Sequence, residues 1–233
     1  MVEARIVATS TQRRCASVHS ALPRVACTMA AADGRALTFV MRGCSLASPA
    51  MKTIKTIGHS NHPIERFVDL LKAGGVERLV DVRSMPWSRR FPQFGRERLA
   101  NTLAEAGIDY AWEGEALGGK PRQGGGYDDL AARPEFKHAI SRLIDGSTST
   151  ALCLMCAEKE PLDCHRTVLV SRRLAERGVA IEHLLADGTT KPHGEVEEAL
   201  LRKSGGADLF EDRDARLARA YQARERAMKG KSA

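Results

Sequence analysis

Residues 53–82, which read TIKTIGHSNHPIERFVDLLKAGGVERLVDV, decide the fold class. The pattern predicts a strand over 53–57, a helix over 63–74 and a second strand over 78–82. The helix begins at a proline, which is favoured in a first helical turn, and ends at two glycines. A strand, a helix and a strand in this order form a βαβ unit with two parallel strands. The apolar residues of the helix fall at helical spacing on one face: Ile64, Phe67, Val68, Leu70 and Leu71.

The same alternation continues along the chain. Repeated βαβ units predict an α/β fold, a single three-layer domain with a mainly parallel sheet of about five strands flanked by helices. Two connections are long: residues 83–94, rich in arginine and aromatic side chains, and residues 113–129, whose glycines predict a mobile loop. The further strands are expected over 108–112, 151–155 and 179–184, and the further helices over 96–106, 134–145 and 164–177.

The chain is expected to have three segments. Residues 51–204 form the α/β domain, and residues 205–233 form a charged C-terminal helix and tail, expected to lie across the domain. Residues 1–50 carry six arginines, two acids and no sustained periodicity. Three interpretations stay open for them: a disordered extension, an organelle-type transit segment, or an upstream stretch included by a misjudged start codon. The last is favoured because Met51 directly precedes the first predicted strand.

Charge and cysteine content narrow the class of protein. Of the net charge of +7, residues 1–50 contribute +4, so the near-balanced remainder favours a mixed solvated surface. No apolar run reaches the roughly 18 residues that a membrane span needs, and no membrane partner is expected. Cys153, Cys156 and Cys164 cluster without a preceding secretory segment. A reducing, cytoplasmic compartment is expected, in which such thiols are catalytic, metal-binding or core residues.

A ligand site is expected at one edge of the sheet. Ligands of parallel α/β sheets bind beyond the carboxyl ends of the strands, where loops meet helix N-termini. The pattern places reactive or charged side chains at these ends, which predicts that they converge on one site. They are His59, Ser60 and Asn61 after the first strand, Asp81 and Arg83 after the second, Glu113 and Glu115 after the third, Cys156 and Glu158 after the fourth, and His183 at the fifth.

Most of the chemistry is expected in residues 156–166, Cys-Ala-Glu-Lys-Glu-Pro-Leu-Asp-Cys-His-Arg. Asp163 is the expected N-cap of the following helix, which places His165 and Arg166 in its first turn. Free N–H groups there favour an anion and lower the pKa of a nearby thiol. A capping or packing role is the alternative for His165.

Cys153 is predicted to be a core thiol rather than part of the site. If the fourth strand continues to Cys156, the odd separation of the two cysteines points them to opposite faces. A zinc site made from Cys153, Cys156, Cys164 and His165 stays open, but it requires the strand to end early.

Arginines are the candidate anion-binding groups. Arg166 and Arg83 are expected to hold a carboxylate or phosphate, because a guanidinium forms paired hydrogen bonds to either. The alternative for Arg166 is a salt bridge to Asp81, Glu158 or Glu160.

The 83–94 loop has two interpretations. Its aromatic residues, Trp87, Phe91 and Phe94, alternate with arginines, as in surfaces that stack on bases and bind phosphates. A lid whose aromatic side chains pack on the domain explains the same residues.

Several motifs resemble the domain of unknown function 488 (DUF488) family. The resemblance covers about residues 52–200 and implies an α/β domain that begins near Met51. The Val80–Arg83 motif is also similar to the Asp-x-Arg of rhodaneses, but nine residues separate Cys156 from Arg166, more than in a Cys-phosphatase cradle. The motifs are TIGHSN at 56–61, VDVR at 80–83, PQF at 92–94, LGG at 117–119, and the pattern of Cys156, Glu158, Pro161, Cys164, His165 and Arg166.

Three functions follow from this pattern. The first is a cysteine-dependent hydrolase or transferase with Cys156 or Cys164 as thiolate, His165 as acid or base and Glu158 orienting. It would act on an anionic, nucleotide or nucleic-acid-like substrate. The second is a non-catalytic nucleic-acid or nucleotide-binding module, and the third is a metal or redox site at Cys156, Cys164 and His165. The sequence names no cofactor and no oligomeric state. The expected substrate-binding residues are His59, Ser60, Asn61, Asp81, Arg83 and Arg166.

Overall fold

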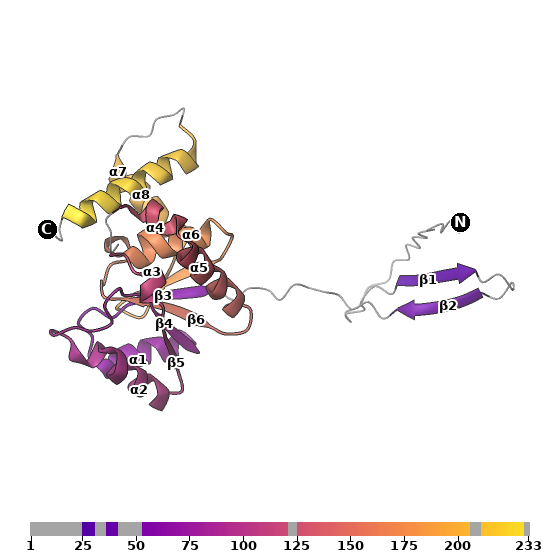
Figure 1. The fold of residues 1–233 in the computed structure, drawn as a ribbon, viewed down its shortest axis with the longest axis horizontal. Coiled ribbons are helices and arrows are strands. Elements are labelled where there is room, and N and C mark those ends of the chain that lie inside the picture. The colour runs from indigo at the N-terminus through magenta and orange to yellow at the C-terminus, as the bar shows by residue number, and fades with distance from the viewer. Residues whose placement is uncertain (1–24, 31–35, 42–52, 121–124, 206–210, 231–233) are drawn as a thin grey trace. The chain divides into compact units, whose positions relative to one another are not determined.

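The computed structural model describes residues 25–30, 36–41, 53–120, 125–205 and 211–230 (Figure 1). The chain divides into two compact units, Met1–Ser48 and Pro49–Ala233. In the first unit, strand β1 (Val25–Ala30) pairs antiparallel with β2 (Ala36–Met41), although the sequence shows no strand periodicity there. The other residues of 1–50 lie outside the described part, and the origin of this segment stays a prediction.

The second unit contains a six-stranded, mainly parallel sheet, which confirms the predicted fold class. The strand order is β5-β4-β6-β3-β7-β8, and β8 alone runs antiparallel to its neighbour. The five expected strands are the parallel ones. The sequence does not predict β8, because its three residues, two polar residues and a proline, show no strand periodicity. The bounds are β3 (Ile54–Gly58), β4 (Arg78–Asp81), β5 (Asp109–Trp112), β6 (Leu152–Cys156), β7 (Ile181–Leu184) and β8 (Thr190–Pro192).

Helices cover both faces of the sheet (Figure 1). On one face, α1 and α2 pack with Ile57, Leu79 and Met155 in one buried cluster. On the other face, α5, η3 and α6 pack with Val80 and Leu154 in a second cluster. The helices are α1 (Ile64–Ala73), η1 (Pro92–Phe94), α2 (Arg96–Glu105), α3 (Gly114–Leu117), α4 (Tyr127–Ala132), α5 (Pro134–Gly146), η2 (Pro161–Asp163), η3 (Arg166–Ser171), α6 (Arg172–Ala175), α7 (His193–Ser204) and α8 (Arg213–Gly230).

Two local predictions are wrong. The expected loop over 113–129 contains α3 and the beginning of α4, whose short apolar pairs gave too weak a periodicity to detect. The expected α-helix over 164–177 is interrupted, because η3 is a π-helix with i→i+5 geometry and only α6 is α-helical.

The C-terminal helix packs on the domain. Tyr221 of α8 is 1% exposed, and its hydroxyl lies 3.2 Å from both His193 Nε2 and Glu197 Oε1 of α7. Residues 206–210 of the expected C-terminal segment lie outside the described residues. The helices in the described part of the chain include none with the length and apolar character to cross a membrane.

The order of the strands creates a switch point. The connections after β3 and β4 lead to the face of α1 and α2, whereas the connection after β6 leads to the opposite face. Because β6 lies between β4 and β3, neighbouring connections diverge at the carboxyl ends of these three strands. A crevice of this kind is where open α/β sheets bind ligands.

Candidate functional site

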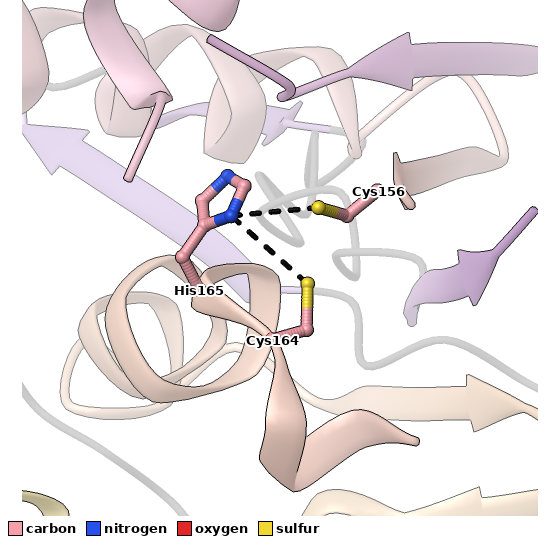
Figure 2. Close-up of side chains that lie close together, drawn as sticks. All are labelled: Cys156, Cys164 and His165. Carbon is pink, nitrogen blue, oxygen red and sulfur yellow. Dashed lines mark hydrogen bonds between the residues drawn. The ribbon is translucent and has the colours of Figure 1, made fainter. Parts of the chain in front are cut away.

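Two thiols and one imidazole meet at the carboxyl end of β6 (Figure 2). Cys156, the last residue of β6, has its Sγ 3.4 Å from His165 Nδ1, and Cys164 Sγ is 4.0 Å from the same nitrogen. The two sulfurs and the imidazole nitrogen all lie within 4.8 Å of one another. Both cysteines are buried, whereas His165 is partly exposed and forms the accessible side of the group. We refer to these three residues as the Cys-Cys-His cluster.

A backbone carbonyl fixes the tautomer of His165. Its Nε2 lies 2.8 Å from the carbonyl oxygen of Val82 at the end of β4. A carbonyl oxygen only accepts, so Nε2 must carry the proton and donate it. In the neutral ring, Nδ1 therefore presents a lone pair to the two sulfurs. A histidine oriented in this way can accept a proton from a thiol or bind a metal ion.

Cys164 occupies the helix start that was assigned to Asp163. Cys164 is extended, with φ −134° and ψ 140°, and its Sγ accepts a hydrogen bond from the N–H of Arg166 at 3.4 Å. Asp163 instead ends η2 and pairs with Arg224 of α8. The prediction of Asp163 as N-cap is wrong because the intervening 3₁₀ turn shifts the helix start by one residue.

The surroundings of the cluster shift the pKa values of its two thiols in opposite directions. Burial alone would raise the pKa of Cys164, but a hydrogen bond from Cys156 and the charges of Arg166 and His165 lower it well below the usual range. Burial raises the pKa of Cys156 well above that range, and its hydrogen bond to Cys164 adds to the effect. Burial alone would lower the pKa of His165, yet the bond to Cys164 raises it. These shifts favour deprotonation of Cys164 over that of Cys156.

Arg166 supports the cluster from within the protein. Its side chain is 0% exposed, and its terminal nitrogens donate to the carbonyl oxygens of Glu158 and, at 3.0 Å, Lys159. It forms no salt bridge with a carboxylate in the described part, so its charge is directed at the cluster. Gly58 is required beside it, because a Cβ there would collide with the carbonyl of Glu158.

A second buried group joins the ends of β3 and β4. Arg83 Nη2 pairs with Asp81 Oδ2 at 2.6 Å and donates to the carbonyl of Phe94 at 2.8 Å. Its Nη1 lies 3.2 Å from His59 Nε2. Tyr110 donates to Asp81 Oδ2 at 2.8 Å. Burial, followed by the charge of Arg83, lowers the pKa of His59 to about 4, so its ring is neutral at pH 7.

The remaining expected residues lie apart from the cluster. The carboxylate of Glu158 is exposed, and only its backbone carbonyl touches Arg166. Ser60 has a left-handed backbone, with φ 46°, and bonds to the exposed Asn61. The fifth-strand residue, His183, is buried between Thr56 and His193. Glu113 pairs with Arg142, and Glu115 is exposed.

Two observations concern residues outside the expected set. Cys153 is 0% exposed and packs with the α1–α2 face, which confirms that it is a core thiol. Gly119 belongs to the LGG motif and has no predicted role of its own, yet a Cβ on it would lie 2.5 Å from His165 Cβ. The double glycine at 118–119 was the available signal of a close approach. The hydrogen bond from His165 to the Val82 carbonyl involves the backbone, so no side chain in the sequence indicates it.

Comparison with known proteins identifies a family match. Residues 63–173 match the family model described as "Domain of unknown function DUF488", which confirms the resemblance over a shorter range than residues 52–200. The match includes Asp81, Arg83 and the whole Cys-Cys-His cluster, but it begins after His59. The searches of curated proteins and of solved structures each found no significant match.

Proposed function

We propose that the domain containing this DUF488 match is a cysteine-dependent hydrolase or transferase of an anionic substrate, with Cys164 as nucleophile and His165 as acid and base. The observation that carries the proposal is the orientation of His165, whose Nε2 is fixed on Val82 while Nδ1 faces both sulfurs. A nucleophile, a base and a group that orients the base are the parts that covalent catalysis by cysteine requires.

The chemical steps use the charge states of the cluster. The Cys164 thiolate attacks an electrophilic centre of the substrate, a sulfur bond forms, and the bond to the leaving group breaks. His165 gives its Nδ1 proton to that leaving group. His165 then takes a proton from water, or from the hydroxyl of another molecule that receives the transferred group. The oxygen of that molecule displaces the sulfur and restores the thiolate. Arg166 and the N–H at the helix start stabilise the thiolate before and after the reaction.

Other expected roles are assigned more narrowly in this proposal. Cys156, which donates to Cys164, is a positioning residue rather than a second nucleophile. Arg83 and His59 hold each other and the 83–94 loop, since their polar atoms already bond to protein groups. Substrate approaches from the side of His165, the partly exposed member of the cluster.

The test is a pH titration of the thiolate. Alkylation is less suitable, because both thiols are buried and alkylating reagents have restricted access to them. The ultraviolet absorbance of thiolate is followed against pH for the full chain, Cys164→Ser and Cys156→Ser. We expect a transition well below the usual cysteine pKa that vanishes in Cys164→Ser and moves upward in Cys156→Ser. Cys153→Ser, at a core thiol, is the matched control. If Cys164→Ser leaves the low-pH transition intact, the assignment of the nucleophile is wrong.

A metal centre at the same cluster is the second candidate function. It is favoured by three ligand atoms within 4.8 Å and by the carbonyl bond on the far nitrogen of His165, which is a common support for a metal-bound histidine. Bound metal would keep both sulfurs deprotonated. Metal content of purified protein separates the candidates: stoichiometric zinc or iron that both Cys156→Ser and Cys164→Ser remove supports the metal centre, and its absence supports the thiolate enzyme.

A further inference from the structure

The 83–94 loop exposes apolar side chains beside the site. Among the residues that the structure describes, Met85 and Trp87 are the exposed large hydrophobic side chains, at 52% and 54%. Single exposed apolar residues are common, but an exposed tryptophan is not required by the fold. The other two aromatic residues of the loop behave differently: Phe94 stacks on His59 at 4.3 Å, and Phe91 contacts the same ring edge-on at 6.3 Å.

The loop is ordered at both ends, so Trp87 is held in an outward position. The N–H of Arg96 donates to the carbonyl of Pro86 at 2.8 Å and closes the loop. Inside it, the N–H of Phe91 donates to Ser88 Oγ at 3.1 Å. Two aromatic rings of the loop therefore pack on the domain, as a lid would, and the third faces solvent.

Exposed arginines follow the exposed tryptophan in the sequence. Arg89, Arg90, Arg96 and Arg98 are all exposed, and Glu97 is the sole acid between residues 83 and 98. In the described part of the chain, neither Arg89 nor Arg90 pairs with a carboxylate. The guanidinium of Arg90 lies over the ring of Phe91 at 5.4 Å, which leaves its polar edge available to a ligand.

A groove lies between α2, which follows the loop, and the edge strand β5. It has a volume of about 590 Å³ and is lined by residues that include Arg96, Asn101, Tyr110 and Trp112. The guanidinium of Arg96 lies 4.9 Å from the Trp112 ring, so an arginine and an aromatic ring recur together here. Tyr110 connects the groove to Asp81.

We propose that the outer side of the 83–94 loop, with Trp87, Arg89 and Arg90, binds single-stranded nucleic acid and presents it to the Cys-Cys-His cluster. Unpaired bases stack on exposed aromatic rings, and arginines bind the phosphates between them. In a duplex the bases stack on each other, so no base is free to stack on the tryptophan. The inference rests on the proposed function for the identity of the reacting site, and it narrows the anionic substrate to a polynucleotide.

The loop is close enough to the cluster for one ligand to reach both. Val82, whose carbonyl holds His165, is five residues before Trp87. The two Cα atoms are therefore at most roughly 18 Å apart, since an extended chain advances at most about 3.6 Å per residue. Several nucleotides of a single strand cover such a distance.

The test is fluorescence anisotropy with labelled oligo(dT) and oligo(rU), over about 50 to 200 mM salt. We expect the full chain to bind, and Trp87→Ala to weaken binding about 10-fold while Trp87→Phe retains most of it. In the double variant Arg89→Ala/Arg90→Ala, the slope of log affinity against log salt should fall by about 0.7 for each arginine. The matched control is Arg202→Ala/Lys203→Ala, which removes the same charge from α7 and should change nothing.

Several outcomes would overturn the inference. They are no binding at low salt, equal binding by Trp87→Ala, equal binding of a duplex, and competition by polyglutamate as effective as that by oligo(dT). The last result would indicate an acidic protein partner. The thiolate titration of Cys164 in the same preparations is independent of this loop, so an intact low-pH transition with failed binding removes this inference and leaves the proposed function.

Discussion

Gly119 is the residue through which the packing around His165 can be tested. A methyl group at this position would lie 2.5 Å from His165 Cβ, closer than carbon atoms approach without displacement. Because the far side of the ring is bonded to Val82, the imidazole cannot retreat without changing its distance to the sulfurs.

We predict that Gly119→Ala raises the pKa of Cys164 toward the ordinary range. The substitution displaces the imidazole that helps to stabilise the thiolate. The measurement is the same ultraviolet titration of thiolate. Gly194→Ala is the matched control, since a Cβ at Gly194 meets nothing within 4 Å. An unchanged titration in Gly119→Ala would show that the ring has other room to move.

Asp81 provides a second prediction at the scale of one residue. Asp81 and Arg83 are 0% and 6% exposed at their side chains, so removing the carboxylate leaves a buried guanidinium without its counter-charge. We expect Asp81→Asn to lower the free energy of unfolding by about 3–5 kcal/mol. Asp109→Asn breaks an exposed pair with Arg78 and should cost less than about 1 kcal/mol. Urea denaturation of both variants measures the contrast, and equal losses would contradict the argument.

At the scale of elements, a buried hydroxyl links α8 to α7, in addition to the ion pairs of Arg213 with Glu197 and Glu198. The Tyr221 hydroxyl lies between His193 and Glu197 in a buried position. We expect Tyr221→Phe to lower the free energy of unfolding by about 1–3 kcal/mol, because it leaves buried polar atoms without their partner. Glu197→Gln keeps an acceptor for this hydroxyl and should cost less in the same denaturation experiment. The reverse order would place the stabilisation in the charge of Glu197.

The elements also show how far the sequence predicts the site. The β3–α1–β4 unit was found within two residues because its apolar residues repeat at strong, local periods. The sequence also predicts Cys156 at the end of the fourth strand and His165 at the start of the next helix, and these two residues lie together in the structure. The start of the helix after β6 could not be predicted from the sequence. A 3₁₀ turn and a π-helix replace its regular first turn, and neither has a recognisable side-chain period. The contact of His165 with a carbonyl from β4 is non-local and leaves no trace in the sequence.

At the scale of the whole molecule, buried neutral histidines link stability to pH. Burial lowers the pKa of His193 to about 4 and lowers that of His183 well below 6.5. Each histidine binds a proton near pH 6.5 in the unfolded chain, whereas in the folded protein His193 does so only near pH 4 and His183 only well below pH 6.5. Their contribution is therefore complete above pH 6.5 and is lost as pH falls toward 4.

We predict that the free energy of unfolding decreases between pH 7 and pH 5, by up to about 1.4 kcal/mol per pH unit for each such histidine. His193→Gln should be less stable than the full chain at pH 7 but should show a shallower decline. His138→Gln, at an exposed residue of α5, is the control with an unchanged slope. Urea denaturation at the two pH values measures both, and a steeper decline in His193→Gln would contradict this account.

The π-helix η3 has a consequence for how the site tolerates changes in chain length. A π-turn holds one residue more than the α-turn that it replaces, so η3 determines the rotational phase between Cys164–His165 and the rest of the helix. Deleting one residue from 166–171 would restore a regular helix and rotate its start by about 100°. Burial of Leu174 would then be kept only by turning His165 away from Val82. A single-residue deletion here is therefore expected to preserve the fold and abolish the cluster.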